Sequence, residues 1–248
     1  MTTMAVAAAA RHGDAIAGLL DACVIRHQAG GQTLLIHLLR YDGARFHFGG
    51  FAQAGLACPA GIADSVPRRQ ADYCFGRLAA GRALADAGWP GFQVATGSRR
   101  EPLWPAGVVG AISHNHVLAA ACVAPADRLR GVGIDIESAL DAAAIAGVEM
   151  EVLSAEERDA LRSPSALPYP MRLAIAFSAK ESFYKALFPT VGHYFGFDAI
   201  RIEALDAAAG CLRFAVRQPC CPQWPAGRQG RIDFRLLDAD TVLTVFAW

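Results

Sequence analysis

Residues 177–187, with the sequence FSAKESFYKAL, place the strongest constraint on the fold of this chain, because their spacing predicts one amphipathic helix. Aromatic and aliphatic residues supply the apolar side of that helix. Glu181 and Lys185 are four residues apart, so they project from the same face. Taken alone, such a pair is typical of an exposed ion pair that stabilises a helix by about 0.2–0.5 kcal/mol.

A second segment, residues 131–137 (GVGIDIE), alternates apolar and acidic residues and predicts a β-strand. On that strand the two isoleucines would face a core, while Asp135 and Glu137 would share the opposite face. Two neighbouring carboxylates repel each other unless a cation lies between them. Together with Glu181 they would form an oxygen site suited to Mg²⁺ and phosphate chemistry. The alternative is an ordinary amphipathic strand with a solvated acidic face.

The two segments in this order and spacing resemble the 4′-phosphopantetheinyl transferases of the Sfp type, and more closely the enterobactin-synthase component D branch. The likeness covers about residues 68–197. It implies an α+β fold of two similar α/β halves related by a pseudo-two-fold axis, with the active site in the cleft between them. We place the N-terminal half at residues 1–128 and the C-terminal half at residues 129–248. The implied activity is transfer of 4′-phosphopantetheine from coenzyme A to a serine of an apo acyl or peptidyl carrier protein, which releases adenosine 3′,5′-bisphosphate.

The resemblance also implies roles for residues of the C-terminal half. Asp135, Glu137 and Glu181 would hold Mg²⁺, and Asp135 and Lys185 would contact coenzyme A. Glu181, directly or through a water, would accept the serine proton. Lys185 would stabilise or protonate the departing phosphate. Lys180 points about 100° away from Glu181 on a helix, and we expect it to have a supporting role at most.

Basic residues of the N-terminal half match positions that hold the phosphates of coenzyme A in the resembled family. Pro67 opens a helical pattern that runs to about residue 87. An arginine fork is always charged and can bind phosphate through two hydrogen bonds, although a solvated helix face or a surface turn would use the same residues. The expected coenzyme A contacts are Arg69 and Arg77 on this helix, Arg99 and then Arg100 in the following loop, and the Ser113–His114 pair, after which Asn115 departs from the family pattern.

Composition favours a soluble, folded protein. Hydrophobic residues make up 54%, the formal net charge is zero, and nothing in the charge predicts nucleic-acid binding. The seven cysteines lack a Cys-x-x-Cys spacing, so we expect reduced thiols in a cytoplasm. The alanine run at residues 5–10 is too short for a signal sequence, and no apolar run approaches the ~18 residues of a membrane span. We expect a cytoplasmic monomer with no membrane span.

The remaining segments give local predictions. Residues 33–40 predict a strand that pairs with residues 45–48, and residues 117–123 predict another strand. Four glutamates near residues 149–157 are interpreted as solvated or capping charges, with a capping box at Ser154. The main helix is expected to span residues 170–188 and to end at Pro189. Residues 198–247 predict an antiparallel sheet that contains a loop at residues 219–230.

Two other classes of function remain open from the sequence. One is a catalytically silent module that binds carrier proteins, against which the acidic and basic motif residues argue. The other is a Mg²⁺-dependent pyrophosphatase of coenzyme A or nucleotides. A Nudix-type hydrolase would need a carboxylate-dense helix, which residues 156–158 do not supply. Release of adenosine bisphosphate tests the silent module, and turnover of coenzyme A with and without a carrier protein separates the transferase from the pyrophosphatase.

Overall fold

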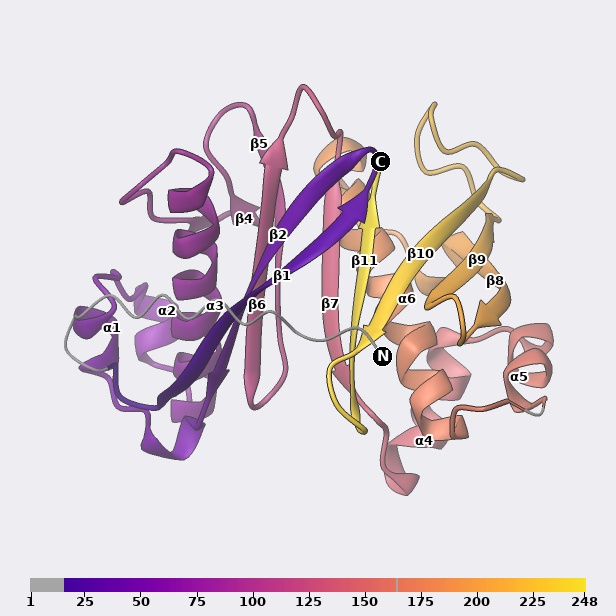
Figure 1. Cartoon of the computed structure of the whole chain (residues 1–248), viewed down its shortest axis with the longest axis horizontal. Coiled ribbons are helices and arrows are strands. Elements are labelled where there is room, and N and C mark those ends of the chain that lie inside the picture. The colour runs from indigo at the N-terminus through magenta and orange to yellow at the C-terminus, as the bar shows by residue number, and fades with distance from the viewer. Residues whose placement is uncertain (1–15, 164) are drawn as a thin grey trace. The chain divides into compact units, whose positions relative to one another are not determined.

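The computed structural model describes residues 16–163 and 165–248, so the alanine run at residues 5–10 lies outside the described residues. The chain divides into two compact units, one ending at Arg128 and the other beginning at Leu129. Each unit combines an antiparallel sheet with helices (Figure 1). The mixed α and β content agrees with the expected fold class. The pseudo-two-fold axis and the cleft between the halves stay predictions.

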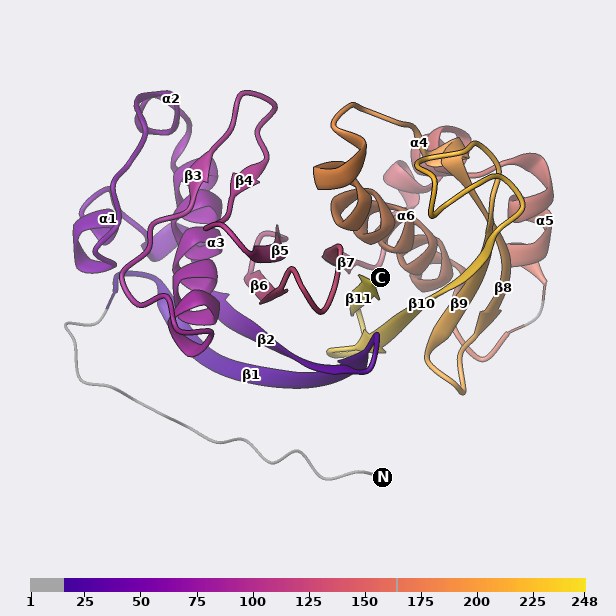
Figure 2. The same cartoon turned by 90° about the horizontal axis from the view of Figure 1, so that it is seen from above.

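The first unit is a four-stranded antiparallel sheet with one long helix on it. The strand order is β1-β2-β6-β5. Helix α3 (Pro67–Asp86) packs against β2, β5 and β6, and Figure 2 shows it along one face of the sheet. The strands are β1 (Leu19–Ala29), β2 (Gln32–Tyr41), β5 (Val108–His114) and β6 (Leu118–Pro125). The short elements are the 3₁₀ helix η1 (Gly43–Arg45), α1 (Gly50–Gln53), α2 (Ala60–Ala63), β3 (Ala95–Thr96) and β4 (Pro102–Leu103).

Small residues bring α3 close to its sheet. Ala71, Cys74 and Ala79 are fully buried along the inner face of the helix. Phe75 from the same face stacks on Tyr41 of β2, with ring centroids 4.4 Å apart. Aromatic pairs of this kind add to the stabilisation that comes from burial alone. The predicted helix at residues 67–87 is thereby confirmed.

The second unit is a five-stranded antiparallel sheet in the order β7-β11-β10-β9-β8. Helix α6 (Tyr169–Val191) lies on β7 and β11, while α4 (Ala142–Val152) and α5 (Ala155–Arg162) pack beside it. The predicted strand at residues 131–137 and the predicted C-terminal sheet are confirmed. The strands are β7 (Val132–Ser138), β8 (Ile200–Asp206), β9 (Cys211–Val216), β10 (Gln229–Leu236) and β11 (Thr241–Ala247), and η2 spans Phe197–Ala199.

Two local predictions are wrong. Residues 45–48 form no strand with β2, which instead pairs with β1 and β6. The chain turns away because the Asp42 side chain accepts a hydrogen bond from the Ala44 backbone and starts η1. The main helix does not end at Pro189 but continues to Val191. A proline in the last turn removes only one hydrogen bond, and Gly192, with a left-handed φ of 71°, then ends the helix.

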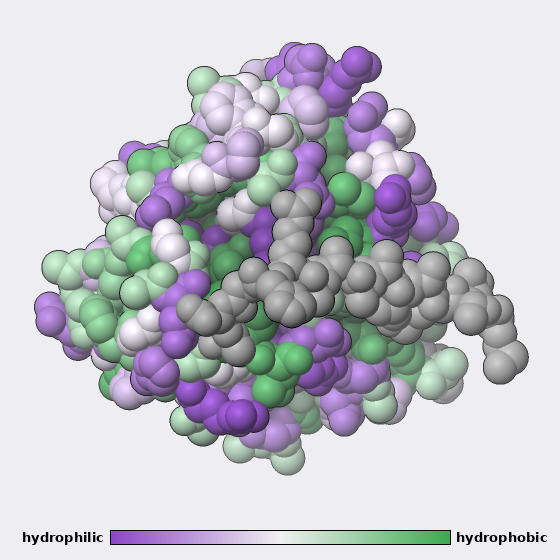
Figure 3. Space-filling view, turned by 60° about the vertical axis from the view of Figure 1, so that its left-hand side comes forward, coloured by the Kyte–Doolittle hydropathy of each residue, from purple (hydrophilic) through white to green (hydrophobic). Residues whose placement is uncertain are grey.

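The surface and the helices carry little information about partners. Figure 3 shows hydrophobic and hydrophilic residues interspersed on the face that it presents. Exposed large apolar residues, such as Phe48, Met150 and Tyr194, come from different elements, and scattered residues of this kind are usual on protein surfaces. Within the described residues no helix is long and apolar enough to cross a membrane. The seven cysteines are all free thiols.

Candidate functional site

Strand β7 and helix α6 approach each other closely because β7 begins with glycine. A Cβ atom on Gly133 would lie 1.8 Å from the Ser182 backbone oxygen, and one on Gly131 would lie 2.0 Å from the Ala186 oxygen. The helix therefore lies directly on the glycine face of the strand. Residues at period two share a face, so Asp135 and Glu137 continue the face that α6 covers. The sequence pattern placed both carboxylates correctly on one face, and the alternative of a solvated acidic face does not hold for the buried Asp135.

Asp135 is buried, with 3% of its surface exposed. Its Oδ1 atom lies 2.5 Å from Nζ of Lys185, which is partly exposed. Burial lowers the pKa of Lys185, but the carboxylates of Asp135, Glu181 and Glu137 together raise it above its ordinary value. Lys185 therefore remains protonated at neutral pH. The spacing of four residues suggests a solvated ion pair between Lys185 and Glu181 on the helix surface. In the structure Lys185 also forms an ion pair with Asp135 of the strand.

The other two carboxylates complete an electrostatically coupled cluster. Burial and the charge of Asp135 raise the pKa of Glu137 to about 8, with Glu181 adding to the rise and Lys185 opposing it. The pKa of Glu181 is also raised, mainly by burial. The charge of Lys185 opposes this rise, and the charge of Asp135 adds to it. These mutual effects mean that Asp135, Glu137, Glu181 and Lys185 lie within electrostatic reach of one another. The strand and the helix have thus brought together four predicted site residues.

In the described parts of the chain, no three or more His, Cys, Asp or Glu side chains are arranged so that they could hold a metal ion. The donor chemistry nevertheless fits Mg²⁺, which prefers carboxylate oxygens. The charge of Asp135 raises the pKa of both Glu137 and Glu181, and this repulsion would fall if a cation joined the three carboxylates. The magnesium site stays a prediction.

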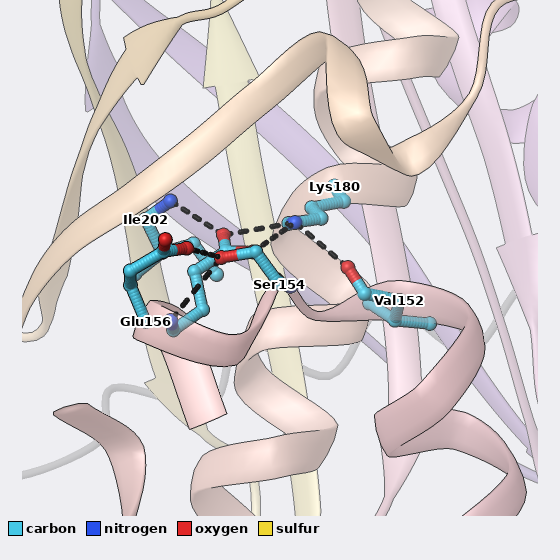
Figure 4. A network of polar contacts seen from close by, with 6 residues as sticks. Val152, Ser154, Glu156, Lys180 and Ile202 are labelled. Carbon is cyan, nitrogen blue, oxygen red and sulfur yellow. Dashed lines mark hydrogen bonds and ion pairs between the residues drawn. The ribbon is translucent and has the colours of Figure 1, made fainter. Parts of the chain in front are cut away.

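Lys180 is held away from this cluster in a buried network of its own (Figure 4). Its Nζ atom donates to the Val152 backbone oxygen at 2.8 Å and pairs with Glu157 at 2.9 Å. Glu157 also accepts hydrogen bonds from the backbone nitrogens of Ser154 and Ile202. The capping box at Ser154 is confirmed. Glu157 is nevertheless not a solvated charge, because its carboxylate joins α5 to α6 and β8, and Lys180 links the pair to α4 through Val152.

Glu149 also departs from the prediction of a solvated charge. It is 7% exposed, and its carboxylate accepts hydrogen bonds from Arg162 at 2.9 Å and from the Tyr169 hydroxyl. The Tyr169 hydrogen bond holds the pKa of Glu149 below its ordinary value. These contacts tie α4 to α5 and to the start of α6. Sequence spacing could not find them, since the partners are 13 and 20 residues away.

In the first unit a cavity of about 590 Å³ has a basic wall. Arg69 and Arg77 of α3, Arg100 of the following loop and His114 at the end of β5 all line it. The Arg77 guanidinium donates to the Thr96 hydroxyl at 2.8 Å and lies 4.7 Å from the Tyr73 ring centre. Cationic side chains around a cavity of this size suit a phosphorylated small molecule.

Two predicted residues of this unit lie outside that wall. Arg99 was the preferred loop residue, but Arg100, not Arg99, lines the cavity. Arg100 has a left-handed φ of 69°, and the Arg99 backbone nitrogen donates to Glu101 at 2.8 Å. Ser113 is 4% exposed and does not line the cavity, although its neighbour His114 does. The roles of Arg99, Arg100, Ser113 and His114 stay predictions.

Comparison with known proteins now identifies the family. Residues 58–124 match the family model of the 4′-phosphopantetheinyl transferase N-terminal domain, and residues 131–234 match that of the 4′-phosphopantetheinyl transferase superfamily. Enterobactin synthase component D of Salmonella typhi is 35% identical over 175 residues, which cover 69% of this chain and 70% of that protein. The chain belongs to the 4′-phosphopantetheinyl transferase superfamily.

Two further relatives carry the same activity in their names. The 4′-phosphopantetheinyl transferase Npt of Nocardia iowensis is 38% identical over 150 residues, which cover 60% of this chain and 66% of that protein. The 4′-phosphopantetheinyl transferase PptT of Mycobacterium tuberculosis is 36% identical over 158 residues, which cover 63% of this chain and 68% of that protein. The chain is therefore a transferase, and the resemblance inferred from its two motifs is confirmed.

The matches also place both candidate sites of this phosphopantetheinyl transferase within its family regions. The acidic and basic cluster on β7 and α6 lies within residues 131–234, and the residues that line the basic cavity all lie within residues 58–124. Sequence reasoning missed Asp72, Tyr73 and Thr96 of that wall. A signal for Asp72 and Tyr73 was present, since they lie between Arg69 and Arg77 on the same helix.

Proposed function

We propose that this transferase moves 4′-phosphopantetheine from coenzyme A to a serine of an apo carrier protein and releases adenosine 3′,5′-bisphosphate. The observation that carries the proposal is the coupled cluster of Asp135, Glu137, Glu181 and Lys185 on β7 and α6. Phosphoryl transfer requires positioned groups and compensation of developing charge. This cluster offers carboxylates and an ammonium group side by side. A catalytically silent binding module would need neither.

Asp135, Glu137 and Glu181 would hold Mg²⁺, since their oxygens suit it and their mutual repulsion favours a bound cation. When bound, the ion would supply positive charge to the pyrophosphate oxygens. Glu181 would accept the serine proton, because its raised pKa brings it nearer to the operating pH of a general base. Lys185, whose raised pKa keeps it charged, would donate to the departing phosphate.

The basic cavity of the first unit would hold the remaining phosphates of coenzyme A. Arg69, Arg77, Arg100 and His114 line it and supply the hydrogen-bond donors that phosphate oxygens need. Arg99 and Ser113 would support this wall from the loop and from β5. The second candidate, a pyrophosphatase, would act on coenzyme A without a carrier protein.

The acceptor is a carrier protein of a biosynthetic assembly. One relative is named enterobactin synthase component D, which supports a peptidyl carrier of siderophore or nonribosomal peptide synthesis as the first acceptor to test, with acyl carriers of polyketide or fatty-acid synthesis next. We expect the enzyme to act as a monomer in the cytoplasm.

The test is single-turnover transfer from fluorescent coenzyme A to a panel of purified apo-carriers, with release of adenosine bisphosphate measured in parallel. Glu181→Gln keeps the size of the side chain but removes a base, and loss of general-base help costs ~10²–10⁴-fold in rate. Lys185→Met keeps the apolar stem and removes the charge. We expect both variants to fold and to lose most of kcat.

The matched control is the surface pair of Arg201 and Glu203, whose charged atoms lie 3.2 Å apart. Glu203→Gln breaks an exposed ion pair without touching the cluster and should leave transfer unchanged. Activity of Glu181→Gln or Lys185→Met within a few-fold of wild type would remove the catalytic role of the cluster and leave its charges as structural ion pairs. Release of adenosine bisphosphate at the full rate without any carrier would favour the pyrophosphatase.

A further inference from the structure

The basic cavity wall contains a single carboxylate among its lining residues. Asp72 lies on α3 between Arg69 and Arg77, and the lining side chains that can carry charge are otherwise cationic. A negative charge in a site for anionic phosphates opposes binding of the ligand. Asp72 is therefore costly at this position unless it acts through another residue of the wall.

The contacts of Asp72 point to His114. Oδ2 of Asp72 lies 4.0 Å from Nδ1 of His114, with 13% of the aspartate side chain and 33% of the histidine side chain exposed. Oδ1 of Asp72 accepts a hydrogen bond from the hydroxyl of Tyr41 at 2.7 Å. The carboxylate is thus held from one side by a buried tyrosine and faces the imidazole from the other.

Tyr41 also fixes the backbone directly after His114. The Tyr41 hydroxyl has two acceptors within hydrogen-bond distance, the Asn115 backbone oxygen at 2.6 Å and Oδ1 of Asp72. Burial and the hydrogen bond to Asp72 raise the pKa of Tyr41, so the hydroxyl keeps its proton and remains a donor. The Asn115 side chain accepts from the backbone nitrogens of Val117 and Leu118 and closes the turn. The position of His114 relative to Asp72 is therefore built into the fold.

We propose that Asp72 is a positioning residue that orients His114 and keeps its imidazole protonated, so that His114 can bind a phosphate of coenzyme A as a cation. The proposal rests on the proposed function only for the identity of the ligand. An opposite charge within about 4–6 Å favours the charged form of a titratable group.

The charges around His114 make such a partner necessary. Arg69 and Arg77 of α3 and Arg100 of the loop line the same cavity and, as like charges, favour the neutral imidazole. Tyr41 of β2 reaches Asp72 and is uncharged. Tyr73 of α3 also lines the cavity, and Arg68 of α3, which acts electrostatically on Tyr41, adds a further like charge. Asp72 is the group in this wall that favours imidazolium. With a phosphate bound, the imidazolium would donate a charge-assisted hydrogen bond.

The direct test is an NMR pH titration of the ligand-free full chain carrying ¹⁵N-labelled histidine, with the His114 signals assigned by His114→Gln. We expect the pKa of His114 in the wild type at or above its ordinary value of about 6.5. Asp72→Asn, which keeps the shape, should lower it by about one unit. Asp72→Glu, which keeps the charge, should restore most of the shift.

Kinetics with coenzyme A supply the second readout. Asp72→Asn should raise KM for coenzyme A several-fold with a smaller effect on kcat, and the rise should grow between pH 6 and pH 8 as the less basic imidazole loses its proton. The control is Asp86→Asn, because Asp86 faces His37 at 3.2 Å in the same unit but does not line the cavity. It should leave both the His114 titration and KM unchanged.

The outcomes separate this proposal from the proposed function. A wild-type His114 pKa clearly below 6.5, or no shift in Asp72→Asn, overturns the proposal even if the enzyme transfers phosphopantetheine normally. The wild-type titration decides this point without any variant, should Asp72→Asn fail to fold. A shifted His114 with KM unchanged at every pH also overturns the functional part of the proposal. If the wild type does not use coenzyme A at all, the proposed function fails while the titration still tests the Asp72–His114 pair.

Discussion

Removing Lys180 should destabilise the second unit without removing a reacting group. The side chains of Lys180 and Glu157 are 1% and 2% exposed, and their charged atoms are 2.9 Å apart. Lys180→Met leaves the Glu157 carboxylate buried with only its two backbone donors, and breaking a buried pair from one side costs about 3–5 kcal/mol. For a chain of this size each kcal/mol lowers Tm by about 2–4 °C, so we expect a loss of about 6–20 °C.

The assay is thermal unfolding followed by circular dichroism, with urea titration at 25 °C as the second measurement. Lys180→Met/Glu157→Gln should be more stable than Lys180→Met, because the unpaired buried charge is gone even though one backbone donor loses its best acceptor. The deficit of Lys180→Met should also shrink on acidification. The unpaired Glu157 would have a folded-state pKa above its unfolded value, so its penalty is absent at low pH and grows as pH rises through the folded-state pKa.

The exposed pair of Arg201 and Glu203 provides the comparison. Arg201→Met should change stability by no more than about 1 kcal/mol. The reasoning is refuted if Lys180→Met behaves like Arg201→Met, or if the double variant is no more stable than Lys180→Met.

Two further predictions concern the charged sites. In EDTA, the free energy of unfolding should fall as pH rises from about 4.5 to about 8, because the raised folded-state pKa of Glu137 makes the folded protein bind an extra proton in that window. Glu137→Gln should flatten this decline, and Mg²⁺ should offset it in the wild type. A decline that is unchanged in Glu137→Gln contradicts the assignment. Arg69→Ala and Arg77→Ala should each raise KM for coenzyme A more than they lower kcat. If an arginine contacts the 3′-phosphate, its removal should cause little further rise in KM when the substrate is dephospho-coenzyme A. A full rise in KM with both substrates would place neither residue at that phosphate.

The sequence predicted the acidic strand and the long helix because both follow from local spacing. Period two assigned Asp135 and Glu137 to one face, and a spacing of four put Glu181 and Lys185 together. The same spacing could not show that α6 covers the acidic face, since that depends on the close approach permitted by Gly133. Burial is the largest cause of the raised pKa values of Glu137 and Glu181.

Long-range partners account for the other failures. The capping box at Ser154 was predictable because its two members are three residues apart, but the pairing of Glu157 with Lys180 spans 23 residues and joins separate helices. The strand at residues 33–40 was predictable from its apolar run. The partner of this strand was not predictable. Residues 45–48 alternate as a strand would, but the upstream strand β1 supplies the hydrogen bonds to β2.

Each unit builds its polar site where a glycine lets the long helix approach a strand. In the second unit Gly133 brings β7 under α6, so that Asp135 meets Lys185. In the first unit a Cβ on Gly76 would lie 3.1 Å from Ile112 and 3.9 Å from His114, so α3 approaches β5 at this point. Asp72, one turn before Gly76, is thereby set beside His114. A methyl group at Gly133 would push helix and strand apart, and one at Gly76 would force the Ile112 side chain to shift. The geometry of both charged sites therefore depends on residues that carry no charge.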